Sequence, residues 1–179
     1  DTPPADTTGT TTPPTLTYQF GAKLEPPVGR VVHGMGQWVN YNPPYLALLP
    51  AAEKPASELE FIPLDDTARP WDPSKIAARM AAIGTAGRVP LMDLAPRGNQ
   101  STPAELALLP DKTYGIDSAI AYTTQWDARI QEFINVVKAY AKPVMLRIGG
   151  EFSGNWNGYL PYAYPVAFRK IVTMFRASG

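Results

Sequence analysis

Cysteine is absent from this sequence, so disulfide bonds and thiolate metal sites are excluded. The single histidine excludes a metal site built from several histidines of this chain, and we expect neither a metal nor a cofactor. No apolar run approaches the roughly 20 residues that a membrane-spanning helix needs. Sixteen basic residues balance sixteen acidic ones without forming a basic stripe, which argues against nucleic acid as a partner.

Proline and glycine are plentiful by contrast, with twenty and fourteen copies, and they predict many loops. Residues 1–17 are polar and rich in proline and threonine, so they cannot bury enough apolar surface to fold alone. We interpret them as an extended leader or linker, typical of a bacterial protein that is secreted or held at the cell surface. Residues 18–179 are long enough for one sizeable core.

Four apolar stretches predict β-strands. Residues 144–148 form a nearly continuous apolar run, which is typical of a parallel strand covered on both faces. Asp93 lies near the end of an earlier strand, and Val31 and His33 share one face of the first by the period of two. Three of the predicted strands span residues 58–64, 88–95 and 144–148, and residues 29–38 contain the first strand and the loop that follows it.

Helices are predicted between and after these strands. Asp72 followed by Pro73 is a helix start, with Asp as the N-cap and Pro at the first helical position. Thr124 and Asp127 match the capping-box pattern and predict a helix that begins at Thr124. Two further helices are expected over residues 44–56 and from Tyr164 onward, the second with Phe168 on its buried side.

Strand and helix therefore alternate four times, which predicts a parallel α/β sheet with right-handed crossovers. Four such units are half of a (β/α)8 barrel, and this is the fold we expect for residues 18–179. An open doubly wound sheet is the alternative. Because a half barrel leaves two sheet edges unpaired, we expect a further C-terminal segment or a second chain to complete it.

The stretch from residue 142 to 159, KPVMLRIGGEFSGNWNGY, is the most informative in the chain. Glu151 follows the fourth predicted strand directly, and parallel α/β barrels keep their chemistry at this end of their strands. Strand alternation predicts that Arg147 and Glu151 project to the same side.

Residues 146–156, together with 164–175, resemble the fourth-strand motif of glycoside hydrolases of the (β/α)8-barrel clan, nearest to the β-mannanase family, family 26. Residues 33–37 resemble the first-strand loop of bacterial relatives of that group. The resemblance covers the N-terminal half of such an enzyme. It implies that Glu151 is the general acid/base of a retaining mechanism, with the nucleophile on a seventh strand outside this chain. The mannanase motif places histidine directly before the glutamate and other members of the clan place asparagine there, whereas this chain has Gly150.

The predicted substrate is a β-linked polysaccharide, mannan-like or another β-glycan. Aromatic rings suit the apolar faces of sugars, and amides suit their hydroxyl groups. The alternative is a non-catalytic carbohydrate-binding or structural surface protein, which Gly150 favours because glycine cannot contact a sugar with a side chain. The candidate substrate-binding residues are Trp156, Asn155, Tyr159, His33, Gln37, Arg147 and Asp93.

Overall fold

The computed structural model describes residues 17, 25–36, 42–64, 71–96, 115–151 and 157–179. The chain divides into two compact units, Asp1–Val32 and His33–Gly179. In the first unit, the amide of Val28 donates a hydrogen bond to the carbonyl of Thr17 at 2.8 Å. All of the described helices and strands belong to the second unit.

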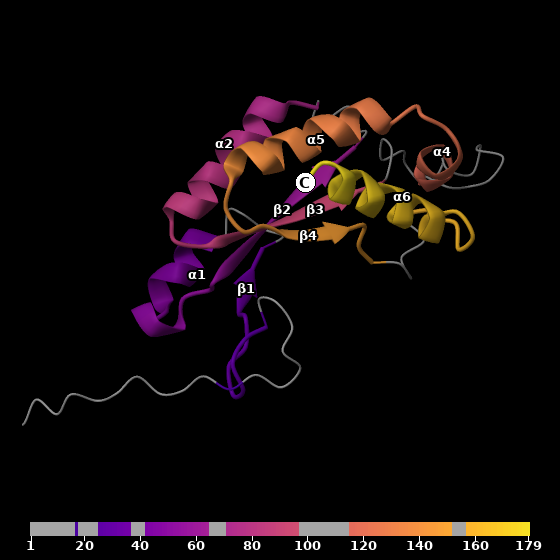
Figure 1. The fold of residues 1–179 in the computed structure, drawn as a ribbon. Helices are drawn as coiled ribbons and strands as arrows, with labels where there is room; N and C mark the ends of the chain where they lie inside the picture. The colour runs from indigo at the N-terminus through magenta and orange to yellow at the C-terminus, as the bar shows by residue number, and fades with distance from the viewer. Residues whose placement is uncertain (1–16, 18–24, 37–41, 65–70, 97–114, 152–156) are drawn as a thin grey trace, which may run out of the picture. The chain divides into compact units, whose positions relative to one another are not determined.

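The second unit is an α/β structure built on a four-stranded parallel sheet (Figure 1). The strands lie in the order in which they occur along the chain, β1-β2-β3-β4, and each pairs with the next. The parallel sheet predicted from the sequence is therefore confirmed, whereas a closed barrel is not formed by the strands that the structure describes. Their bounds are β1 Gly34–Met35, β2 Ser57–Pro63, β3 Val89–Ala95 and β4 Met145–Ile148.

The first strand is much shorter than predicted. Only Gly34 and Met35 pair with β2, opposite Ser57 and Glu58. Val31 is 85% exposed and belongs to the first unit, so the expected shared strand face of Val31 and His33 is wrong.

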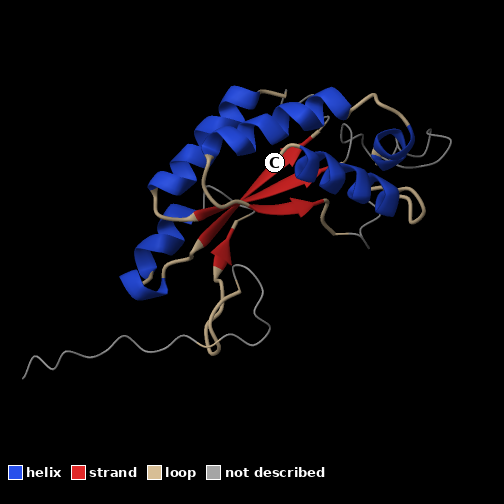
Figure 2. Cartoon of the chain, in the orientation of Figure 1, coloured by secondary structure: helices blue, strands red, loops and turns tan. Residues whose placement is uncertain are grey.

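Helices alternate with the strands, as Figure 2 shows. The long helices α2, α5 and α6 lie on one side of the sheet (Figure 1), and the short helix α4 packs against α6. The helix predicted over residues 44–56 is divided, because α1 ends before Pro50 and a separate 3-10 turn follows. The bounds are α1 Asn42–Leu48, η2 Ala51–Glu53, α2 Pro73–Thr85, α4 Asp117–Tyr122, α5 Asp127–Tyr140 and α6 Tyr164–Ala177.

The hydrophobic core fills the space between the sheet and these helices. Alternate residues of a strand face opposite sides, so Met92 and Leu94 of β3 reach the helices while Leu91 and Asp93 lie on the other face. Phe133 of α5 is fully buried and packs edge-on against Phe175 of α6, with ring centroids 6.0 Å apart. The helix-covered face is therefore the main source of stability.

Helix α2 begins as predicted. The Asp72 carboxylate accepts hydrogen bonds from the amides of Ser74 at 3.0 Å and Lys75 at 3.3 Å, and Pro73 is the first helical residue. The Ser74 hydroxyl, which donates to the same carboxylate at 2.6 Å, and the Lys75 amide lower the pKa of Asp72. The Asp-Pro pair thus fixes where the chain enters the helix after β2.

The predicted start of α5 is wrong. The helix begins at Asp127, and the Thr124 side chain does not cap it. The hydroxyl of Thr123 accepts from the amide of Gln125 at 3.2 Å, so the preceding threonine makes the local turn. Helix α4 was not predicted, because its short length gives only a weak periodic signal.

Helix α6 begins at Tyr164 and Pro165 as predicted, but Phe168 is not on its buried side. The Phe168 side chain is 41% exposed, whereas Ala167 and Ile171 are buried. No described helix combines the length and the apolar character that crossing a bilayer requires.

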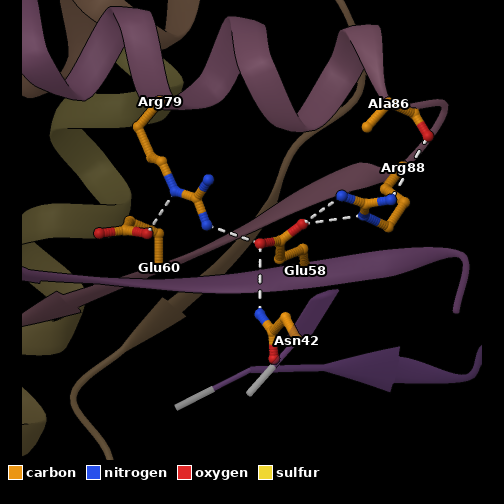
Figure 3. Close-up of polar contacts among 6 residues, drawn as sticks. All are labelled: Asn42, Glu58, Glu60, Arg79, Ala86 and Arg88. Carbon is orange, nitrogen blue, oxygen red and sulfur yellow. Dashed lines mark hydrogen bonds and ion pairs between the residues drawn. The ribbon is translucent and has the colours of Figure 1, made fainter. Parts of the chain in front are cut away.

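An ion-pair network joins the amino-terminal ends of β2 and β3 to α2 (Figure 3). Glu58, with a side chain only 3% exposed, accepts from Arg79 at 2.6 Å and from Arg88 at 2.8 Å. Asn42 donates to the same carboxylate at 3.3 Å, and Arg79 also pairs with Glu60 at 2.8 Å. Burial raises the pKa of Glu58, but the Arg88 hydrogen bond and the Arg79 charge outweigh it, so that pKa is lowered.

Candidate functional site

The carboxyl ends of β3 and β4 lie side by side and carry the candidate site. Leu94 pairs with Ile148, and the amide of Gly149 donates to the carbonyl of Leu94 at 2.9 Å. Glu151 comes three residues after the end of β4 and is exposed at this edge. The structure therefore places Glu151 where the sequence analysis predicted it, at the end of a parallel strand.

The backbone turns sharply between β4 and Glu151. Gly149 has φ +67° and Glu151 has φ +52°, and both values lie in the left-handed region. The period of two that relates side chains along a strand ends with Ile148, so strand alternation does not extend to Glu151, and a shared side for Arg147 and Glu151 stays a prediction. A non-glycine residue with positive φ is uncommon, and such residues are concentrated at functional sites.

Asp93 and Arg147 form an ion pair across the two strands. They are register partners on the sheet face opposite the core helices, and Arg147 Nε lies 3.4 Å from Asp93 Oδ2. The Asp93 side chain is 2% exposed and that of Arg147 is 36% exposed. Because a buried carboxylate needs a compensating charge, Arg147 stabilises Asp93 while its own guanidinium stays accessible.

Two tyrosines pack beside Gly149. The Tyr164 hydroxyl donates to the carbonyl of Ile148, and the rings of Tyr159 and Tyr164 have centroids 5.3 Å apart. Burial, with a further contribution from the Asp93 charge, raises the pKa of Tyr164 to about 12. The hydroxyl of Tyr164 therefore holds its proton and fixes the last carbonyl of β4.

An open hollow of about 300 Å³ adjoins these rings. Its walls are apolar and aromatic, a composition that suits the C–H faces of a sugar ring. The predicted platform residue Tyr159 is thus part of a hollow close to the end of β4. The lining residues are Tyr159, Leu160, Pro161, Tyr164 and Pro165.

Asn157 supports the backbone that carries Glu151. The buried Asn157 amide nitrogen donates to the carbonyls of Gly150 at 2.9 Å and Glu151 at 3.2 Å. These bonds hold the turn from one side, so Asn157 has a positioning role that its side-chain type alone did not reveal.

Asp117 fixes the backbone at Leu160, one of the residues that line the hollow. Its carboxylate is fully buried and accepts from the amide of Leu160 at 2.8 Å. Burial raises the pKa of Asp117, although backbone hydrogen bonds oppose that rise. Neither Asp117 nor Tyr164 was predicted to contribute to the site, and the only signal for Tyr164 was its place at the start of a helix.

His33 does not join this site. Its carbonyl accepts from the amides of Ala56 at 2.7 Å and Ser57 at 3.3 Å, which places it beside the beginning of β2. His33 Nε2 lies 3.2 Å from the Tyr45 hydroxyl. Because the strands are parallel, their beginnings share the edge opposite Glu151, and grouping His33 with Glu151 in one sugar site was wrong.

The remaining predicted binding residues, Trp156, Asn155 and Gln37, lie outside the described residues. Within the described ranges, no three histidine, aspartate or glutamate side chains are grouped so that they could hold a metal ion. No protein-family model matches this chain, and no curated protein matches it significantly.

Proposed function

We propose that this chain is the first half of a (β/α)8-barrel glycoside hydrolase that acts on a β-linked polysaccharide. The observation that carries the proposal is the position of Glu151. It is exposed where the chain leaves β4 at the carboxyl edge of a parallel sheet, and the same end of β4 carries the partly exposed Arg147 and adjoins the aromatic hollow. The motif at residues 146–156, which resembles that of the β-mannanase family, supports the same function.

Sheet topology supports the barrel over the doubly wound alternative. A doubly wound sheet reverses its strand order and carries helices on both faces. Here the strand order is sequential, and α2, α5 and α6 lie on one face (Figure 1). In a closed barrel the other face, which carries Asp93 and Arg147, would become the interior.

Glu151 is assigned the role of general acid/base. In a retaining glycosidase this residue protonates the leaving oxygen, and a second carboxylate about 5–5.5 Å away attacks the sugar. That nucleophile would come from a seventh strand in a further C-terminal segment or a second chain. Arg147 would then help to keep the nucleophile ionised, because a nearby cation favours the charged carboxylate.

A polysaccharide is the proposed partner, and the secreted or cell-surface location inferred from residues 1–17 is consistent with it. The hollow between Tyr159 and Pro165 would serve as a platform for a sugar ring. A non-catalytic carbohydrate-binding protein is the second candidate. The same hollow favours it, since an aromatic platform binds sugar without a catalytic acid.

Replacing Glu151 by Gln tests the enzymatic role in the complete protein. We expect hydrolysis of β-mannan or another β-glycan, measured as release of reducing ends, to fall by at least about 100-fold, because a general acid contributes 10²–10⁴-fold. Glycan binding, measured by titration calorimetry, should change little because the hollow is retained.

The matched control is Glu53→Gln, which alters an exposed glutamate in the 3-10 turn η2. It should leave both hydrolysis and binding unchanged. If the complete protein binds β-glycans but hydrolyses none of them, the non-catalytic candidate replaces the enzyme. If it neither binds nor hydrolyses them, both proposals are wrong.

A further inference from the structure

Gly149 and Gly150 are adjacent in the chain, and each position requires glycine for a different structural reason. Gly149 has φ +67°, a conformation that residues with a Cβ rarely adopt. Gly150 is not among the residues with positive φ. Its backbone would accept other residues, so its need for glycine comes from its surroundings.

The Arg147 guanidinium fills the space where a side chain at residue 150 would stand. A Cβ built on Gly150 would lie 1.7 Å from Arg147 Nη2, 2.4 Å from Cζ and 2.7 Å from Nε. All three distances are far below van der Waals contact. Even alanine at this position would therefore displace the whole guanidinium group, not just its tip.

The guanidinium is held there by one of its nitrogens. Nε lies 3.4 Å from Asp93 Oδ2 and 3.4 Å from the carbonyl of Gly149. Within the part of the chain that the structure describes, Nη1 and Nη2 donate no hydrogen bond. The arginine is thus oriented through Nε, and its side chain as a whole is 36% exposed.

We propose that Gly150 is a positioning residue that seats the Arg147 guanidinium at the end of β4, and that Nη1 and Nη2 bind oxygen atoms of a glycan beside Glu151. A guanidinium has only donors in a planar fork, so it suits a pair of acceptor oxygens. Sugar hydroxyls and a uronate carboxylate both provide such oxygens. The glycan part rests on the proposed function, whereas the seat itself does not.

A double-mutant cycle in the complete protein tests the seat. Gly150→Ala should lower Tm by about 3–6 °C, because moving the guanidinium weakens its pair with buried Asp93. Arg147→Lys keeps a cation for Asp93 but removes the planar group. In that background Gly150→Ala should change Tm by no more than about 1 °C, which makes the two substitutions strongly non-additive.

Gly149→Ala is the matched control, because its cost comes from positive φ. It should lower Tm equally with arginine or lysine at residue 147. If Gly150→Ala behaves like this control, or has no effect in either background, the seat is refuted. Should Arg147→Lys not fold, the double variant Asp93→Asn, Arg147→Met removes both charges and serves as the second background.

Titration calorimetry tests the glycan part, with a neutral β-linked mannooligosaccharide and a uronate-bearing oligosaccharide as probes. Gly150→Ala should weaken binding about 10- to 100-fold, the effect of losing hydrogen bonds to a charged group. Loss for both probes assigns the fork to hydroxyls, and loss for the acidic probe alone assigns it to a carboxylate. Unchanged binding refutes the glycan part. If neither probe binds the parent protein, both the glycan part and the proposed function fail, and the Tm cycle still decides the seat.

Discussion

At the scale of single residues, the backbone at the end of β4 is held by two side chains, and their roles differ from those that their residue types suggest. Asn157 has the side chain expected of a sugar ligand, yet its amide holds the carbonyls of Gly150 and Glu151. Tyr164 opens a helix, yet its hydroxyl bonds to the last carbonyl of the neighbouring strand. Both residues fix the backbone next to Glu151.

Tyr164 should titrate late among the nine tyrosines of this chain. Its pKa of about 12 lies above the ordinary value of 10, because burial disfavours the phenolate. The folded state therefore holds this proton more tightly than the unfolded state. The stability that Tyr164 contributes is complete below about pH 10 and is lost as pH rises toward about 12.

Ultraviolet difference titration of the parent protein against Tyr164→Phe measures this. The difference should show one phenolate appearing near pH 12. Tyr122, which is 61% exposed, provides the control through Tyr122→Phe. A Tyr164 phenolate that appears near the ordinary value of 10 would contradict the assignment.

At the scale of helices and strands, local sequence signals were strongest where backbone chemistry decides the outcome. Asp72 before Pro73 located the start of α2, and apolar runs located β2, β3 and β4. The start of α5 was missed because two neighbouring threonines offer similar hydroxyls, and Thr123 makes the turn instead of Thr124.

Tertiary contacts account for what the sequence could not predict. The Asp93–Arg147 pair depends on the register of β3 with β4, which no local pattern encodes. The lack of space for a side chain at residue 150 depends on the path of the Arg147 side chain. His33 shared a sequence motif with the predicted site, but its strand begins at the other edge of the sheet.

Two phenylalanines on neighbouring helices test the core boundary. Phe133→Ala on α5 should reduce the free energy of unfolding by about 3–5 kcal/mol, because it opens a cavity in a fully buried position. Phe168→Ala on α6 should cost at most about 1 kcal/mol, because that ring is exposed. Chemical denaturation of both variants measures the difference, and equal losses would contradict the burial pattern.

At the scale of the whole molecule, the Glu58 network gives the folded state an acid-sensitive component. The pKa of the Glu58 carboxyl is lowered from an ordinary value near 4.5. The stabilisation is therefore complete above that ordinary value and is lost as pH falls through the lower pKa of the folded state. Unfolding of the parent protein should become easier over this acidic range.

Glu58→Gln should reduce the free energy of unfolding at pH 7 by about 2–4 kcal/mol, because it leaves Arg79 and Arg88 without their shared carboxylate. It should also flatten the dependence on pH below about 4.5. Glu60→Gln is the control, since Glu60 is more exposed and, among the described residues, forms its ion pair with Arg79 alone. Denaturation at several pH values distinguishes the two, and an unchanged acid slope in Glu58→Gln would contradict the assignment.

The sequential order of the strands also bears on how the protein is made. Each strand bonds to the one synthesised just before it, so no early segment has to wait for a distant partner to leave the ribosome. The sheet can grow in the direction of translation, with each new helix closing over the strand pair already present. Register partners such as Leu91 and Met145 are nevertheless far apart in the sequence, so each new pairing has to close a long crossover and forms slowly.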